Sequence, residues 1–295
     1  MDPVHDASGS TELHPALAEL PGHLLWRAHA RVTVALGEVL PPGVDIHAYA
    51  VLLALADNVT RSQQELADTV STSRTTMARV AADLVGAGLV ERVRNPHDRR
   101  SYALTRTLAG ATAAETWQHH VDDLQAALTA GFDPGERADF HDLLLRVAGA
   151  EIAPDAPAEL RASPGFLISR IHVRMHRDFL TALEPVALEP RLFAALTALD
   201  STGPIPQAEL ARMLGISAAS IVQMADALEA LGLVERRRDP DDRRAQQLHL
   251  LPGAAGVLVE AGRIAADIAA EQLGPIDRVE TARLVGLLQR FVIGH

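Results

Sequence analysis

An internal repeat constrains this chain of 295 residues more than any other feature of its sequence. Three segments recur at an offset of 144 residues: Glu65–Ala67 as Glu209–Ala211, Gly88–Arg92 as Gly232–Arg236, and Asn95–Arg100 as Asp239–Arg244. Further upstream, Gly22 and Arg27 match Gly165 and Arg170 at an offset of 143. Two copies are too few for a solenoid, so we expect two similar domains that arose by duplication.

The segment between the copies is rich in proline and alanine. It runs from residue 149 to 164 and contains Pro154, Pro157 and Pro164. Because proline breaks helices, no helical pattern is expected there, and the segment is interpreted as a linker. The predicted domains are therefore residues 1–148 and 165–295.

Each copy shows the same order of predicted elements. In the first copy, apolar residues at helical spacing predict helices over residues 24–36 and 50–54. Ser62 and Glu65 fit a capping box that begins a short helix ending near Val70, and Ser73 caps the next helix. Residues 89–94 and 101–105 predict a hairpin, followed by helices over 108–129 and 134–148.

Two short helices followed by a basic hairpin form a winged helix-turn-helix. In the second copy, Ser217 caps the equivalent second helix and residues 233–250 form the hairpin. The fold class is thus mainly α with small β-hairpin wings. We expect two tandem winged helix-turn-helix domains with long interface helices, arranged as a pseudo-dimer.

This pattern resembles the MarR family of transcriptional regulators. The residues that carry the resemblance are the turns Asn95–Arg100 and Asp239–Arg244, each preceded by Gly-Leu-Val-Glu-Arg. The resemblance covers nearly the whole chain, twice. It implies a DNA-binding repressor that responds to a small-molecule effector, with an aromatic compound as one candidate. Family members work as homodimers, so we expect one fused chain to act as a monomeric pseudo-dimer on double-stranded DNA.

The candidate DNA-binding residues lie on the second helix and the wing of each copy. Arginine can form two hydrogen bonds to guanine, whereas hydroxyl groups suit phosphates or either base type. The first set is Ser73, Arg74, Thr75, Thr76, Arg79, Arg94, Arg99 and Arg100. The second set is Ser217, Ser220, Gln223, Arg238, Arg243 and Arg244. The second helix lacks basic residues between positions 217 and 231, so weak or absent DNA binding by this half is an open alternative.

The resemblance also places a ligand crevice between the first helices and the long interface helix. Its candidate residues are Trp26, His29, Tyr49, Trp117 and His172, and core packing is the alternative for them. His172 and His176 have the spacing of a helical metal-binding pair, but the pattern lacks other ligands, so we expect no metal or cofactor.

Composition narrows the remaining classes of function. The chain has no cysteine, which excludes thiol chemistry and disulfides, and no motif of a known catalytic site is present. The first residues lack a secretory signal and no apolar run could cross a membrane, so we expect a cytoplasmic protein that is not an enzyme. The net charge of −11 leaves a second hypothesis open. The chain could be a small-molecule carrier or partner-binding module that kept the fold and lost strong DNA binding.

Overall fold

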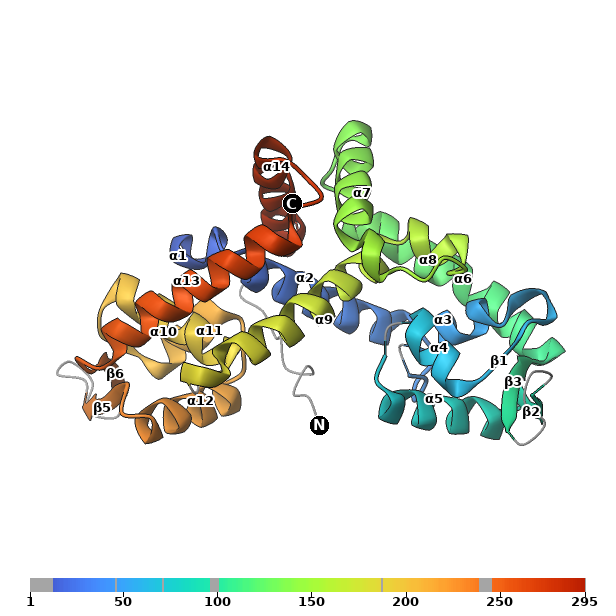
Figure 1. Cartoon of the computed structure of the whole chain (residues 1–295), viewed down its shortest axis with the longest axis horizontal. Coiled ribbons are helices and arrows are strands. Elements are labelled where there is room, and N and C mark those ends of the chain that lie inside the picture. The colour runs from blue at the N-terminus through green and yellow to red at the C-terminus, as the bar shows by residue number, and fades with distance from the viewer. Residues whose placement is uncertain are drawn as a thin grey trace. The chain divides into compact units, whose positions relative to one another are not determined.

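A computed structural model describes residues 13–45, 47–70, 72–95, 101–186, 188–238 and 246–294. Contacts divide the chain into two compact units, Met1–Arg31 with His172–His295 and Val32–Ile171. We call the first the composite unit, because it combines both ends of the chain, and the second the central unit (Figure 1). Helices α2 (Pro21–Val39) and α9 (Pro164–Leu183) each begin in one unit and end in the other.

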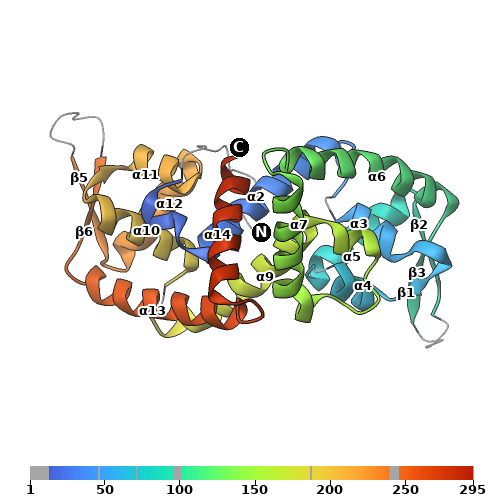
Figure 2. The same ribbon diagram turned by 90° about the horizontal axis from the view of Figure 1, so that it is seen from above.

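The central unit contains the winged helix-turn-helix of the first copy. After α2 come α3 (Ala48–Ala54), η2 (Ala56–Asn58), β1 (Thr60–Arg61), α4 (Gln63–Val70), α5 (Arg74–Gly86), β2 (Val90–Arg94), β3 (Tyr102–Arg106), α6 (Leu108–Leu128), α7 (Pro134–Ala148), η3 (Gly149–Glu151) and α8 (Ala158–Ala162). The sheet has the order β1-β3-β2, with Arg92 opposite Leu104 in the hairpin. In both views the hairpin lies at one end of this unit, close to one end of α5 (Figures 1 and 2).

The composite unit repeats this order with the second copy. It contains α1 (Pro15–Ala18), η4 (Glu184–Val186), α10 (Pro190–Thr202), β4 (Ile205–Pro206), α11 (Gln207–Leu214), α12 (Ala218–Ala230), β5 (Val234–Arg238), β6 (Gln246–Leu250), α13 (Ala254–Gln272) and α14 (Arg278–Ile293). Its sheet has the order β4-β6-β5, with Arg236 opposite Leu248. These partners are the repeat equivalents of Arg92 and Leu104, so the offset of 144 holds in the hairpin register.

Local sequence explains most of the helix boundaries. Ser62 and Glu65 form the predicted capping box, with Ser62 N donating to Glu65 Oε2 at 2.7 Å. Asp133 forms a second box with Glu136. Gly88 and Gly232, which follow the second helix of each helix-turn-helix, have positive φ values of 70° and 68°, a conformation that glycine adopts without steric cost.

The beginning of the first repeat packs on the second repeat. Leu17 is fully buried in a core with Leu192, Leu196 and Leu210. Arg31 donates a hydrogen bond to the backbone oxygen of Phe291 and lies 5.2 Å from the centre of its ring. The compact units therefore differ from the sequence repeats, because the N-terminal helices belong to the composite unit.

The segment predicted as a linker is folded as part of the central unit. The expectation that it contains no helix was wrong, because α8 forms between Pro157, its N-cap, and Ser163. Ile152 and Leu160 are buried, and Asp155 forms an ion pair of 2.5 Å with Arg61. Apolar side chains on both sides of the prolines thus hold this segment in place. Within the described part of the chain, no helix is long and apolar enough to span a membrane.

Candidate nucleic-acid interface

The recognition helix of the central unit is α5, and its first turn presents polar groups to solvent. Ser73 caps the helix by accepting a hydrogen bond of 3.0 Å from Thr76 N. Ser73, Arg74 and Thr75 are exposed, and Thr76 is half-buried. On the opposite side, Met77 and other apolar residues are buried against α4 and the rest of the core. The helix is thereby fixed by its apolar face, and its polar first turn is left available to a partner.

Arg79 is held by two carboxylates. Its guanidinium forms an ion pair with Asp45, and a longer contact of 3.7 Å reaches Asp83 one turn later. Burial alone would raise the pKa of Asp45, but hydrogen bonds from the His47 side chain and backbone, with that of Arg79, lower the pKa below its usual range. Asp45 is therefore a stable anion, and its ion pair holds the guanidinium of Arg79.

The hairpin of the central unit adds exposed arginines. Arg92 and Arg94 are exposed on β2, and the Arg94 guanidinium lies 4.8 Å from the centre of the Tyr102 ring. Such stacking orients a guanidinium while its edge stays accessible. The predicted Arg99 and Arg100 of the turn lie outside the described residues.

The composite unit has the same architecture with a different surface. Ser217 caps α12, accepting from Ser220 N at 3.1 Å, and both serines are half-buried. Gln223 is exposed on α12, as is Arg238 at the end of β5. The predicted Arg243 and Arg244 lie outside the described residues.

An ion-pair cluster joins the hairpin of the composite unit to its recognition helix. Arg236 on β5 lies 2.7 Å from Asp226 and pairs with Glu229, and its Nη2 donates to Val222 O at 3.1 Å. The side chain of Arg236 is 16% exposed, so it contacts α12 rather than solvent. The sequence showed that α12 lacks basic residues, but the pairing of its acids with Arg236 of the hairpin was not predicted. The central unit has Ala82 and Val85 at the equivalent positions, so the cluster belongs to one copy alone.

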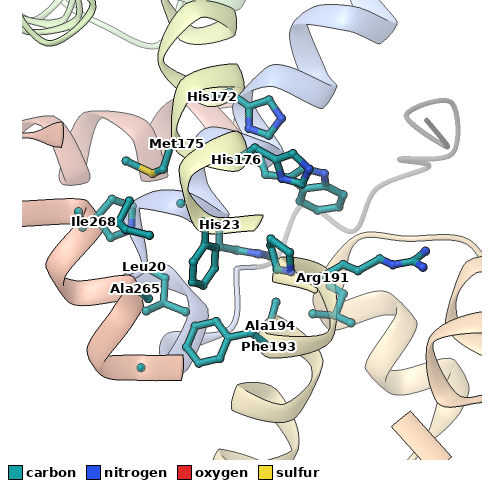
Figure 3. A pocket seen from close by; sticks show the side chains of 18 of the residues that line it. Leu20, His23, His172, Met175, His176, Arg191, Phe193, Ala194, Ala265 and Ile268 are labelled. Atoms are coloured by element: carbon teal, nitrogen blue, oxygen red, sulfur yellow. The ribbon is translucent and has the colours of Figure 1, made fainter. Parts of the chain in front are cut away.

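The five candidate ligand residues fall into two groups. Trp26 and His172 line a cavity of about 370 Å³ in the composite unit (Figure 3). His29 stacks on His172 with ring centres 4.6 Å apart. Tyr49 and Trp117 lie in the core of the central unit, each 6% exposed. The structure therefore does not bring all five to one crevice. Among the described residues, no cluster of three or more metal-ligating side chains occurs.

The helix-turn-helix, the hairpin and the exposed first turn of α5 define a winged helix-turn-helix protein. The MarR family model matches residues 188–245, and a second model described as MarR family matches residues 43–101. These two matches fall on the two copies. The chain thus carries two MarR-family domains in tandem.

Relatives of known name match about half of the chain each. The repressor NicR of Pseudomonas putida is 27% identical over 142 residues, which is 47% of this chain and 87% of NicR. A protein of Thauera aromatica named as a regulator of the hcr operon is 26% identical over 48% of this chain and 87% of its own length. The solved structure of the repressor CouR on a DNA duplex is 37% identical, covers 40% of this chain and 85% of CouR, and has a TM-score of 0.38. The named relatives are transcriptional regulators.

Proposed function

We propose that the chain is a transcriptional repressor that binds double-stranded DNA through both recognition helices and both hairpins. One chain supplies the two winged domains that a homodimer would supply, and a small-molecule effector weakens binding. The family matches and the regulators among the relatives support the DNA-binding part of this proposal.

The observation that carries the proposal is the exposed first turn of α5. Ser73, Arg74 and Thr75 are exposed together at the N-terminus of a helix whose other face is anchored in the core. In helix-turn-helix proteins this part of the recognition helix contacts base edges in the major groove. Arg74 can form two hydrogen bonds to guanine, and Arg92 and Arg94 suit the neighbouring phosphates.

The two halves make unequal contributions in this proposal. The positions of Arg74, Thr75 and Arg79 hold Ala218, Ala219 and Gln223 in the second copy, so α12 offers neutral contacts. A good bidentate base contact contributes about 1–3 kcal/mol of discrimination. The bound DNA site therefore has one constrained half and one degenerate half.

The cavity of the composite unit supports a response to an effector. Met224 of α12 and Leu214 of α11 line it, so an occupant touches both helices of the helix-turn-helix. A ligand that binds better to one position of α12 than to another shifts the population toward that position. DNA binding by this unit then depends on whether the cavity is occupied.

The test is selection of bound fragments from the source genome, followed by salt titration. We expect a preferred site and a steep fall of affinity with salt, since each neutralised phosphate adds about −0.9 to the slope. Arg74→Ala should weaken binding to the selected site by about tenfold or more. The matched control is Arg161→Ala, because Arg161 is exposed on α8 outside the helix-turn-helix and hairpin.

Equal losses for the two variants, or no preferred fragment, would favour the other hypothesis, a carrier or partner-binding module without strong DNA affinity. The single-chain arrangement has its own test. Light scattering at micromolar concentration should give the mass of one chain of 31.5 kDa, and a stable dimer contradicts it.

A further inference from the structure

The cavity of the composite unit has a size and a lining suited to a compact apolar molecule. Its volume of about 370 Å³ lies within the range of small-molecule sites, near the lower end. Leu20, Trp26, Met175, Phe179 and Phe193 supply much of its wall. Figure 3 shows side chains from several helices converging on it. The number of ligand sites and the polar contact proposed here rest on the effector part of the proposed function.

Small residues of α13 leave room for this cavity. Gly262, Ala265, Ala266 and Ala269 form most of the α13 side of the wall, together with the larger Ile268. The offset of 144 can be applied here because the helix that follows begins at a capping box in both copies, at Asp133 and at Asp277. The residues on α6 equivalent to the four small ones are larger, Gln118, Val121, Asp122 and Gln125, whereas Ile268 corresponds to Leu124 of similar size. Ala261, buried beside this wall, corresponds to Trp117.

In the central unit, Val121 is buried, Gln118 and Gln125 are half-buried, and Asp122 is exposed. Trp117 is 6% exposed and packs in the core. Tyr49, the equivalent of Phe193, donates a hydrogen bond of 2.5 Å to Gln118 Oε1. Gln125 Oε1 accepts a hydrogen bond of 3.3 Å from Gly165 N. Core packing and hydrogen bonds thus hold Trp117, Tyr49 and Gln118 at positions whose equivalents line or adjoin the cavity of the composite unit.

His23 gives the cavity one polar position. The side chain lines the cavity, is 8% exposed, and its Nε2 has no hydrogen-bond partner among the described residues. Burial, with the charge of Arg27, lowers the pKa of His23 to about 3, so the ring is neutral at neutral pH. A neutral imidazole nitrogen that is buried without a partner favours a ligand with one uncharged hydrogen-bonding group. The equivalent residue in the first part of α9 is Phe166.

We propose that the chain binds one ligand molecule, in the composite unit only. The ligand is a compact aromatic compound with a single neutral amine or hydroxyl group that hydrogen-bonds to His23. The equivalent place in the central unit binds no second molecule, because Trp117, Tyr49 and Gln118 fill it. A homodimer has two identical ligand sites, whereas this chain has a single site.

The probe for the test is N-phenyl-1-naphthylamine, a neutral aromatic amine whose fluorescence rises in apolar surroundings. A titration with the full chain at a concentration above the dissociation constant should saturate at one probe per chain. Ala265→Leu places three extra carbon atoms in the cavity and should weaken binding about tenfold or more. Ala270→Leu is the matched control, since Ala270 is exposed on the same helix and does not line the cavity. Circular dichroism checks that each variant is folded, and Ala265→Val, which installs the residue of the central unit, replaces Ala265→Leu if that variant is not.

Three results would overturn the inference. They are saturation at two probes per chain, undiminished binding by the folded Ala265 variant, and no binding of the probe at all. His23→Phe tests the polar position: it should reduce the preference for the amine over naphthalene, and an unchanged preference contradicts the assigned hydrogen bond. The two proposals can fail separately. A chain that binds one probe but selects no DNA fragment would support this inference and contradict the proposed repressor function.

Discussion

Releasing Arg79 from Asp45 should tighten DNA binding. Asp45→Asn removes the negative charge but keeps the side-chain oxygen that accepts a hydrogen bond of 2.9 Å from His47 N. The local turn should therefore persist while the ion pair with Arg79 is lost. Arg79, freed from the carboxylate, can then contact DNA without first breaking this pair.

The size of the effect follows from the exposure of the pair. The Arg79 side chain is 59% exposed, so the pair is worth about 0.2–1 kcal/mol after screening by solvent, and the 11% exposure of Asp45 favours the upper end of that range. Because about 1.4 kcal/mol is a factor of ten, affinity should rise by about twofold to fivefold. The salt dependence should steepen by about 0.9, as for one additional phosphate contact.

Fluorescence anisotropy with the selected DNA fragment at several salt concentrations measures both quantities. Glu91→Gln is the control, because it removes one exposed negative charge from the hairpin of the same unit and leaves the ion pairs of Arg79 intact. An equal gain in the two variants would mean that general charge, not the release of Arg79, is responsible. Unchanged or weaker binding by Asp45→Asn refutes the reasoning.

Three further outcomes are expected. Arg99→Ala and Arg243→Ala should each weaken binding to all DNA sequences and flatten the salt slope by about one; unchanged affinity in both variants excludes the turns as contacts. Arg79→Ala should cost more affinity than Gln223→Ala in the same anisotropy assay, and equal losses contradict the predicted asymmetry of the bound site. Finally, the folded-state pKa of His23, about 3, lies below its unfolded value near 6.5, so the neutral buried ring destabilises the fold as pH falls below 6.5, by about 1.4 kcal/mol per pH unit. Urea unfolding from pH 7 to 5 should show a shallower loss of stability for His23→Phe than for the natural chain, and identical slopes refute this.

The sequence was sufficient to predict features that depend on neighbouring residues. The helix starts at Ser73, Asp133 and Ser217 follow from short capping motifs, and the hairpins follow from the repeated Gly-Leu-Val-Glu-Arg segments. These helix starts and hairpins depend on residues only a few positions apart, so they can be predicted from the sequence pattern.

Features that join distant residues were not predictable in the same way. Asp45 and Arg79 are 34 positions apart, and their pairing depends on how the segment before α3 lies beside α5. The burial of Leu160, which holds α8 in a segment rich in proline, likewise depends on the tertiary core. The five candidate ligand residues lie in two different units, and this division also depends on tertiary packing. One signal was present but unused: the aligned repeats place Trp117 opposite Ala261, and this difference in volume marks the cavity.

The position of Leu17 in a core with Leu192 affects how the chain can fold as it is synthesised. The central unit is contiguous, so it can fold soon after its last residues leave the ribosome. The composite unit has to wait, because its first helices are made before the central unit and their partners, including Phe291, are made after it. At about 5–20 residues per second, the apolar face around Leu17 remains without its native partner for roughly 10 s or longer. The helices that complete the second domain are thus its earliest-made and longest-exposed part during translation.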